Sequence, residues 1–292
     1  MEKRKPFIIT VGNHKGGVGK TTSVINIAAG IARTGRNVLV VDADPQSNTT
    51  LALLPDMAVR NTRELRNAFN VDSGKLSTQA CVSNTENLDI VPNSINCMLW
   101  ERSVYTSMDS VLGFKRVMEN DQPLSRYDYI LIDTPPNLGP MVHNALMVSH
   151  GVIVPIPVGD QYALDGVNTY FEILKQIKGQ NADLRILGIL LTKMDGRTQS
   201  HKTNLKQIRV TFEALGFPVF QSVVGVNVDL ERAHTRRQTI FDYAPQSSGA
   251  SYYASATAEL LKILEGVDVD VTLTPASKAS PKMQESQAHN VD

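Results

Sequence analysis

The sequence predicts an α/β fold, in which a mostly parallel, twisted sheet carries helices on both of its faces. Apolar runs of strand length alternate along the chain with segments whose apolar residues recur at helical spacing. The strand-like runs are almost continuously apolar, which is typical of parallel strands covered on both faces. A glycine-rich turn joins the first of these runs to the first helical segment. This alternation predicts a sheet built from strand–helix–strand units.

Turn residues or a change in apolar spacing bound each expected element. Strands are expected at residues 7–12, 37–44, 87–93, 127–136, 151–158 and 184–195. Helices are expected at residues 21–34, 62–69, 139–149 and 161–178. The apolar residues of the first helix fall on one face, and Gly35 is placed to end it. Such a stripe predicts core packing rather than ligand contacts.

Residues 1–266 are expected to form one domain, and residues 267–292 a flexible tail. The chain has 292 residues, of which 42% are hydrophobic and 20% charged, as in ordinary globular proteins. From residue 267 the composition becomes polar and rich in Ser, Pro and Gln, with little to bury. No internal repeat is visible. The first residues form too short an apolar run for a signal peptide or a membrane span, so a cytoplasmic location is expected.

Overall charge and cysteine content exclude few functions by themselves. The formal net charge is zero, so binding to nucleic acid or anionic lipid would require a local patch. Cys81 and Cys97 lack metal-ligand spacing, and we interpret them as incidental thiols in a reducing compartment.

The stretch "GNHKGGVGKTT" at residues 12–22 predicts a phosphate-binding loop. The usual pattern begins with a glycine five residues before Gly19, where this chain has His14, and Lys15 follows it. The strand before the stretch and the helix after it place backbone N–H groups around an anion. We expect Lys20 to neutralise phosphate charge and the Thr21 hydroxyl to bind Mg²⁺.

Carboxylates end two of the expected strands, at the edge where open α/β sheets bind ligands. Asp42 and Asp44 follow "VLVV", and Asp133 ends "YDYILID". We expect Asp133 to hold Mg²⁺ through water. The residues predicted to form the metal site are Thr21, Asp42 and Asp133.

Four segments together resemble one family. "KGGVGKTT", "DADPQSNTT", "YDYILIDTPPNLG" and "LTKMDGRT" occur in the order and approximate spacing of the ParA/MinD class of deviant Walker A P-loop ATPases. The chain most resembles ParA-type partition proteins, over about residues 7–265. The resemblance implies a P-loop NTPase fold, ATP and Mg²⁺ as ligands, and a homodimer that forms on ATP binding and encloses the nucleotides.

The resemblance also implies roles for individual residues. Lys15 would cross the dimer to the phosphates held by the other subunit, and Asp44 would position or activate the attacking water. The implied catalytic residues are Lys15, Lys20 and Asp44. The implied nucleotide-binding residues are Lys15, Gly16, Gly17, Val18, Gly19, Lys20, Thr21, Thr22 and Asn227. Asn227 would lie near the adenine, although Gly225 and Val226 depart from the family pattern beside it.

One motif favours guanine instead. "TKMD", Thr192 to Asp195, matches the [NT]-K-x-D pattern with which related GTPases bind the guanine base. Those proteins keep the glycine that His14 replaces and lack a lysine like Lys15. We therefore expect ATP, and keep a signal-recognition-type regulatory GTPase as a remote alternative.

Local charge favours DNA, over a membrane or a redox partner, as the target on which such an ATPase acts. The tail carries more acidic than basic residues, which disfavours membrane binding, and the cysteines lack the sequence context of a redox cluster. Between residues 197 and 237 basic residues outnumber acidic ones. Those expected to bind DNA phosphates without base specificity are Lys202, Lys206, Arg209, Arg232, Arg236 and Arg237. The first three share one helix face, and the segment "HTRRQ" is expected to add a second cluster beside them.

The expected function is the segregation of plasmid or chromosomal DNA, driven by ATP hydrolysis that a centromere-binding or cargo-adaptor protein stimulates. The protein would then be associated with the nucleoid. An alternative is that the same ATPase positions a protein cargo, such as a microcompartment or a chemoreceptor cluster, on the nucleoid.

Overall fold

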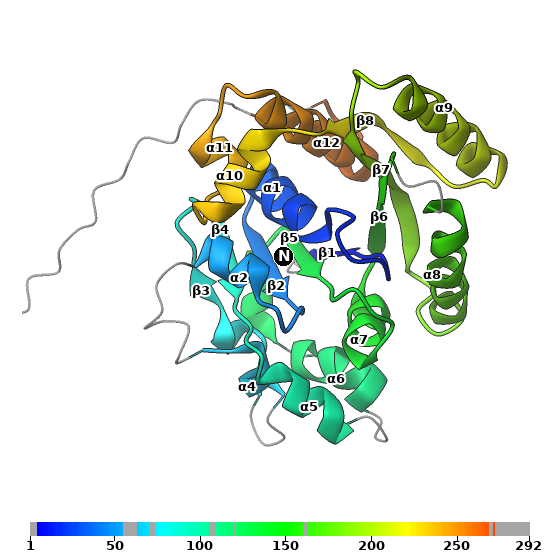
Figure 1. Cartoon of the computed structure of the whole chain (residues 1–292). Helices are drawn as coiled ribbons and strands as arrows, with labels where there is room; N and C mark the ends of the chain where they lie inside the picture. Colours follow the sequence, from blue (N-terminus) through cyan, green and yellow to red (C-terminus); the bar gives the residue numbers. More distant parts are fainter. Residues whose placement is uncertain are drawn as a thin grey trace, which may run out of the picture.

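A single sheet with the strand order β3-β4-β2-β5-β1-β6-β7-β8 forms the centre of the molecule (Figure 1). The structure is a computed structural model, which describes residues 5–54, 63–69, 74–104, 109–119, 121–159, 163–268 and 271. Within these residues the strands are β1 Phe7–Val11, β2 Val38–Asp42, β3 Cys81–Val82, β4 Leu88–Val91, β5 Tyr129–Asp133, β6 Gly151–Pro157, β7 Arg185–Met194 and β8 Val219–Gly225. All neighbouring strands are parallel except β3 and β4, which are antiparallel.

Helices cover both faces of this sheet (Figure 1). In the described part of the chain they are α1 Lys20–Ala32, α2 Asn48–Leu53, α4 Leu65–Ala68, α5 Cys97–Val104, α6 Asp109–Met118, α7 Pro140–Val148, α8 Ala163–Lys178, α9 Gln199–Ala214, α10 Val228–Thr235, α11 Ile240–Tyr243 and α12 Ser248–Glu265. Two 3₁₀ turns occupy Ser77–Gln79 and Gln122–Arg126. None of these described helices is long and apolar enough to cross a membrane.

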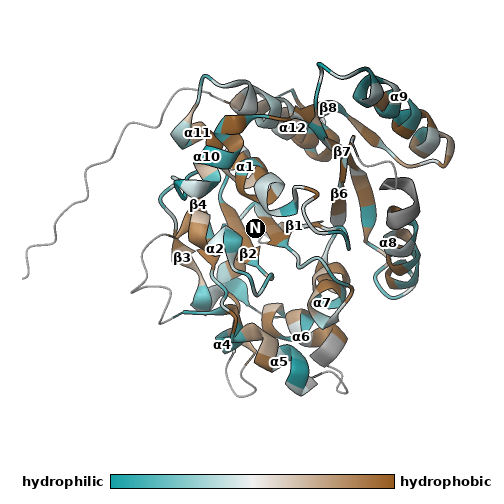
Figure 2. Cartoon of the chain, viewed as in Figure 1, coloured by the Kyte–Doolittle hydropathy of each residue, from teal (hydrophilic) through white to brown (hydrophobic). Residues whose placement is uncertain are grey.

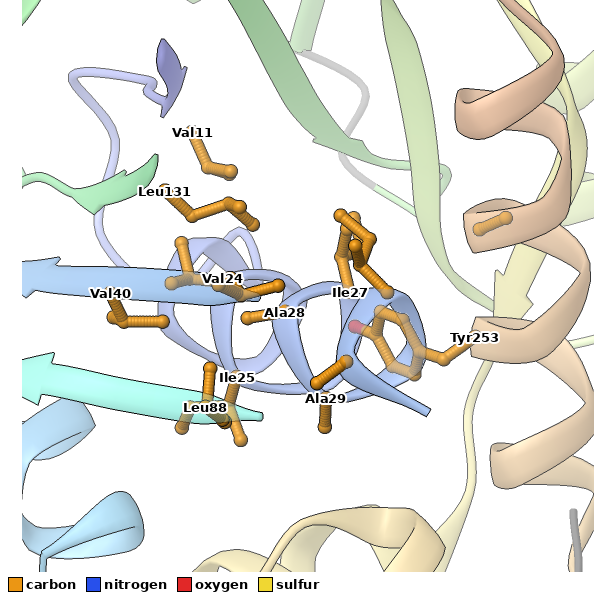
Figure 3. Packing of buried hydrophobic residues seen from close by; sticks show 14 of the residues in the cluster. Val11, Val24, Ile25, Ile27, Ala28, Ala29, Val40, Leu88, Leu131 and Tyr253 are labelled. Carbon is orange, nitrogen blue, oxygen red and sulfur yellow. The ribbon is translucent and has the colours of Figure 1, made fainter. Parts of the chain in front are cut away.

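The core consists of layers on opposite sides of the sheet. On one side α1 packs against the sheet and α12, and its face with Val24, Ile27 and Ala28 meets strand residues and Tyr253 (Figure 3). On the other side α5, α6 and α7 cover one half of the sheet, and α7, α8 and α9 the other half. The strands are mainly brown and the outer helix faces more often teal in Figure 2, in agreement with burial of the strands on both faces.

The register places the ligand-binding edge of the sheet. Strand β5 pairs with both β1 and β2, so Asp133 lies opposite Val11 on one side and opposite Asp42 on the other. The chain leaves β1 toward β2 on one side, and β6 lies on the other side of β1. Ligands of open α/β sheets bind at such a reversal of strand order. The phosphate loop begins there, directly after Val11.

The predicted fold class is confirmed, and most predicted boundaries lie within two or three residues of the observed ones. The predicted helix at 62–69 contains α4, and Thr62 itself lies outside the described residues. Most of the predicted tail, residues 269–270 and 272–292, also lies outside them. Its described part stays close to α12, since Asp268 pairs with Lys262 at 2.8 Å and Val271 is buried in the α1 core.

Candidate functional site

The loop between β1 and α1 places the N-terminus of α1 beside an open cavity. Gly17 and Gly19 have φ angles of 70° and 94°, in the left-handed region that favours glycine. Gly19 is the N-cap of α1, no described side chain caps it, and the first turn contains no acidic residue. The N–H groups of this turn and the positive end of the helix dipole are therefore suited to an anion.

Asn13 fixes the first part of this loop. It is buried, and its amide nitrogen donates to the Pro155 carbonyl of β6 at 2.9 Å. Its amide oxygen accepts a hydrogen bond from the Lys15 backbone N–H at 3.1 Å. The Lys15 carbonyl in turn accepts from the Lys20 ammonium at 2.8 Å. The backbone of Lys15 is thus held from both sides, and its position depends on β6.

Lys20 is buried at the floor of the loop. Only 6% of the residue is exposed. Burial lowers the pKa of its ammonium, although the nearby charges of Asp133 and Asp44 oppose this effect. A phosphate beside Lys20 would favour the charged form further, because it adds an opposite charge in a desolvated place.

Asp133 joins the phosphate loop to α2. Its Oδ2 atom accepts hydrogen bonds from the Thr21 hydroxyl at 2.8 Å and from the Thr49 hydroxyl at 2.6 Å. Burial raises the pKa of Asp133 to about 6, and these two hydrogen bonds partly counteract the rise. Its Oδ1 atom is buried and has no hydrogen-bond partner among the described residues. A buried carboxylate with an unpartnered oxygen is a position that a cation would stabilise.

Asp42 and Asp44 have different positions, although they lie two residues apart. Asp42 is fully buried, and its Oδ2 accepts from the Thr50 N–H at 2.8 Å and the Thr50 hydroxyl at 2.6 Å. Its Oδ1 accepts from the Asp44 N–H at 3.1 Å. Burial and the adjacent Asp133 raise the pKa of Asp42 to about 8. Asp44 lines the cavity and accepts from the Gln46 N–H at 2.9 Å.

The predicted metal contact of Asp42 is therefore not what this arrangement favours. Both of its oxygens are engaged inside the protein, and it is absent from the cavity lining. Asp42 instead fixes the turn that presents Asp44 to the cavity.

The cavity has a volume of about 660 Å³, within the range typical of small-molecule sites. Its polar end is formed by the phosphate loop, Asp44, Gln46 and Asn48. Its other end is formed by the carboxyl ends of β7 and β8 and by α10, with Val224, Leu230 and Tyr253 as apolar lining. Lys193, Asn227, Glu231, His234 and Thr235 also line this second end. A cavity of mixed polarity beside a phosphate loop suits a phosphorylated compound that carries an aromatic base.

Asn227 lines the base end of the cavity but has structural partners. It is the N-cap of α10, and its side-chain oxygen accepts from the Asp229 N–H at 2.8 Å and the Leu230 N–H at 3.3 Å. Its amide nitrogen donates to the Ser248 hydroxyl at 2.8 Å. These contacts use the side-chain oxygen and one of the two amide N–H groups, and they hold Asn227 in place as part of the wall of the cavity.

The "TKMD" segment enters the site by its first two residues only. Thr192 and Lys193 line the cavity, and the Thr192 hydroxyl donates to the Val18 carbonyl at 2.9 Å. Asp195 is not in the lining. Its two carboxylate oxygens accept from Nε and Nη2 of Arg197, each at 2.9 Å. This pairing lowers the pKa of Asp195 to about 2.

The two predicted DNA-binding clusters do not lie beside each other, and that expectation is wrong. Helix α9, with Lys202, Lys206 and Arg209, packs through Ile208 and Phe212 on the α7–α8 side of the sheet. Helix α10 packs through Ala233 on the α1–α12 side. In Figure 1 α9 is drawn at the upper right and α10 to the left of the centre. Sequence proximity misleads here because β8 runs between the two helices.

The clusters differ in their relation to the cavity. Leu230, Glu231, His234 and Thr235 of α10 line it, whereas none of the α9 residues does. Arg232, Arg236 and Arg237 are exposed at the end of α10. On α9, Lys202 and Lys206 are exposed, and Arg209 donates to the Gln221 carbonyl at 2.8 Å.

A magnesium ion fits the residues present. In the described stretches, no group of three or more His, Cys, Asp and Glu residues is placed to hold a metal. Magnesium in phosphate sites commonly needs only one or two protein ligands, with phosphate and water oxygens as the others. The Thr21 hydroxyl and the unpartnered oxygen of Asp133 are suitable donors, and Thr49 is a further hydroxyl at that carboxylate that the sequence interpretation missed. When bound, Mg²⁺ would neutralise phosphate charge at this point.

Comparison with known proteins gives strong sequence matches. A family model described as an AAA domain matches residues 7–186. The sporulation initiation inhibitor protein Soj of Bacillus subtilis (strain 168) is 34% identical over 254 residues, which cover 87% of this chain and 97% of that protein. The chromosome-partitioning ATPase Soj of Thermus thermophilus is 34% identical over 262 residues, which cover 89% and 98% of the two chains.

Solved structures match over similar lengths. Cobyrinic acid a,c-diamide synthase from Mycobacterium smegmatis, with bound ADP and magnesium, has a TM-score of 0.73 and 26% identity, covering 92% of this chain and all of that one. A putative plasmid partition protein from Borrelia burgdorferi B31, bound to AMPPNP, has a TM-score of 0.71 and 24% identity, covering 89% and 98% of the two chains. At that identity the second likeness bears on the fold alone.

Proposed function

Because the chain belongs to the ParA/MinD family of P-loop ATPases, among the ParA-type partition proteins, we propose that it hydrolyses ATP in order to segregate plasmid or chromosomal DNA. The observation that carries the proposal is the Thr21–Asp133 contact at the start of α1. It brings a hydroxyl, a buried carboxylate and the N–H groups of a helix N-terminus to one point, which suits Mg²⁺ and phosphate together. ATP and Mg²⁺ are accordingly the ligands of this site.

Each residue around the phosphates has a distinct task in this proposal. The loop from Gly16 to Thr22 binds the phosphate chain, and Lys20 neutralises charge at its end. Thr21 and Asp133 hold Mg²⁺. Because phosphoryl transfer depends on positioning and charge neutralisation rather than covalent chemistry, a fixed cradle of this kind supplies much of the catalysis.

Asp44 and Lys15 make hydrolysis depend on a second copy of the chain. Asp44 faces the cavity from a turn that Asp42 fixes, so it can orient a water. The Lys15 backbone is anchored by Asn13 and Lys20, which sets the direction in which its side chain leaves the loop. We propose that this ammonium completes the site of the partner subunit, so that the ATP-bound dimer is the hydrolytic form.

DNA is the proposed ligand of the ATP-bound dimer. Exposed arginines on α10 and lysines on α9 supply cations for phosphates without means of base recognition. Since α10 also lines the nucleotide cavity, its cluster is the better placed of the two to respond to ATP. A centromere-binding or adaptor protein would stimulate hydrolysis and release the DNA, and the protein would reside on the nucleoid.

The first test is Asp44→Ala. We expect this variant to bind ATP, to remain dimeric and to stay on DNA, because it assembles but does not hydrolyse. Light scattering would give the mass with ATP and with ADP, and DNA retention would be measured over a range of salt concentrations. Asp183→Ala is the matched control, because Asp183 is exposed and lies just before β7, at the amino ends of the strands and away from the phosphate loop. A monomeric Asp44→Ala with no salt-sensitive DNA retention would contradict the scheme.

Lys15→Ala tests the contact between subunits separately. It should retain most nucleotide affinity, since Lys20 and the loop N–H groups remain, but lose partner-stimulated turnover. Mixing it with an excess of Asp44→Ala protein, which is expected to bind ATP and dimerise without hydrolysing, supplies the missing lysine in trans and should restore part of the activity. Wild-type turnover by Lys15→Ala alone would show that the site is complete in one subunit.

A GTPase is disfavoured by the position of Asp195. A carboxylate that reads guanine must face the base, whereas Asp195 is absent from the cavity lining and pairs with Arg197. Competition between ATP and GTP for one labelled nucleotide would measure the preference directly. Stronger competition by GTP would overturn the ATP assignment.

A further inference from the structure

Helix α5 and the loop before it contact two segments close to Asp42 and Asp133. In the loop between β4 and α5, the Asn93 N–H donates to the Thr50 hydroxyl of α2 at 2.9 Å, and that hydroxyl donates to Asp42 at 2.6 Å. At the second turn of α5, the Glu101 Oε1 atom accepts from the Met141 N–H at 3.1 Å. Both contacts join segments far apart in sequence, so the segment made of the β4–α5 loop and α5 is tied to α2 by Asn93 and to the beginning of α7 by Glu101.

Glu101 supplies a cap that α7 itself lacks. The N-cap of α7 is Gly139, which has no side chain, and Pro140 has no N–H to donate. Among the described residues, no side chain at the N-cap position of α7 itself makes a capping hydrogen bond. The first N–H that can bind an acceptor is that of Met141, and it receives one from another helix. An acidic group there also interacts favourably with the helix dipole.

The segment held by this cap borders the nucleotide cavity. The loop between Asp133 and α7 contains Pro136, which lines the cavity, and the Pro136 Cβ lies 3.9 Å from where a Cβ on Gly16 would be. The other end of the loop is fixed by Thr134, whose hydroxyl donates to the Val11 carbonyl at 3.0 Å. Glu101 therefore fixes the far end of a short loop that touches the phosphate loop.

Glu101 also lies close enough to Asp44 for the two charges to interact. The charge of Asp44 is one of the causes that raise the pKa of Glu101, after burial and against the Met141 hydrogen bond. The Glu101 side chain is half-buried. A carboxylate here influences both loops without lining the cavity.

We propose that Glu101 is a positioning residue for hydrolysis, which holds the start of α7 and the loop at residues 134–139 in place beside the phosphate loop. This inference rests on the proposed ATPase activity. In this role Glu101 affects hydrolysis and not nucleotide binding, because it is not among the residues that line the nucleotide cavity. The loop that it holds lies beside the phosphates, where the attacking water must be aligned. Loss of the cap lets this loop move and leaves the nucleotide bound.

Two substitutions at Glu101 test this role. Glu101→Ala removes the acceptor, and we expect kcat to fall about tenfold while affinity for a non-hydrolysable ATP analogue changes by less than about twofold. Glu101→Gln keeps an oxygen for the Met141 N–H and should retain kcat within about threefold. Arg102→Ala is the matched control, because it removes an exposed charged side chain one residue away on the same helix.

Hydrogen exchange of the 134–142 amides gives a readout that does not need turnover. Analogue binding should slow exchange of the Met141 N–H in the wild type and in Glu101→Gln, but much less in Glu101→Ala. Wild-type kcat for Glu101→Ala, or equal losses in kcat and analogue affinity, would overturn the inference while the ATPase stands. If the wild type itself shows no turnover, the proposed ATPase function fails. Equal exchange protection of the Met141 N–H in the wild type and in Glu101→Ala would reject the positioning role of Glu101.

Discussion

Replacing Gly12 with alanine is expected to destabilise the protein and to disturb the phosphate loop together. A Cβ at this position would lie 1.8 Å from the Tyr170 hydroxyl oxygen and 2.8 Å from its Cζ atom. Normal contacts between such atoms are about 3.5 Å or longer. Tyr170 is fully buried on α8, so the rigid ring cannot turn toward solvent. Either β1 or α8 must shift.

The expected cost is large for a single methyl group. Overpacking of a dense core typically costs about 1–3 kcal/mol, and an overlap between a strand and a buried ring belongs at the upper end. For a domain of this size, that corresponds to a fall in Tm of about 5–10 °C. Because Gly12 precedes Asn13, which anchors the loop to Pro155 and Lys15, a shift of β1 should also weaken binding of an ATP analogue.

A double-mutant cycle with Tyr170→Phe identifies the atom responsible. The Tyr170 hydroxyl has no hydrogen-bond partner in the part of the chain that the structure describes, so its removal alone should cost little or be stabilising. In Gly12→Ala/Tyr170→Phe the closest overlap is gone and only the Cζ contact remains, so part of the stability should return. Urea unfolding gives the free energy of unfolding of the wild type, of each single variant and of the double variant. A Gly12→Ala variant within about 0.5 kcal/mol of the wild type, or no gain from Tyr170→Phe in its presence, would refute this account of the packing.

Three further changes test the site. Thr21→Ala removes the hydroxyl at the proposed metal position, so affinity for the Mg²⁺ complex of an ATP analogue should fall about tenfold in titration calorimetry, with ADP binding in EDTA nearly unchanged. The pKa of Asp133 is raised to about 6 by burial, so its carboxylate destabilises the nucleotide-free fold as pH rises from its unfolded value near 4 to about 6. Its charge also opposes ionisation of Asp42, whose pKa is about 8, so this penalty increases further toward pH 8. Urea unfolding between pH 4 and 8 should therefore show Asp133→Asn gaining stability relative to the wild type as pH rises, whereas a gap that narrows with rising pH would contradict the assignment. Asn227→Ala should cost about 1 kcal/mol through loss of the α10 cap and change ATP-analogue affinity by less than about threefold, and a loss of affinity without a loss of stability would indicate a base contact instead.

The sequence predicted the central strands because each is a nearly continuous apolar run. It did not identify β8, an edge strand in which only some residues are fully buried, or β3, which has only two residues. Helix α12 escaped notice for another reason. Its buried face mixes Tyr253, Leu260 and Leu261 with small residues, such as Thr257 against Gly30, so the apolar stripe is diluted by residues that also occur in loops.

The phosphate loop was predictable because its residues are consecutive. The residues that support it were not, since Thr49, Asn93 and Glu101 reach the site from separate segments and are of types that are common on any surface. Only the pairing of β2 with β5, and the contacts of α5 and α7, bring these residues together. Spacing along the chain contains no signal for such contacts.

A carboxylate at the end of a strand is available to a ligand only when the protein leaves it available. Asp195 matches a guanine-reading motif, but Arg197 occupies both of its oxygens. Asp42 lies beside Asp133 in the sheet, but Thr50 and the Asp44 N–H occupy its carboxylate. Asp133 keeps one oxygen without a partner among the described residues, and Asp44 faces the cavity. The motifs predict functional roles for all four of these acids. The contacts of neighbouring residues leave only Asp133 and Asp44 available to Mg²⁺ and water beside a phosphate chain.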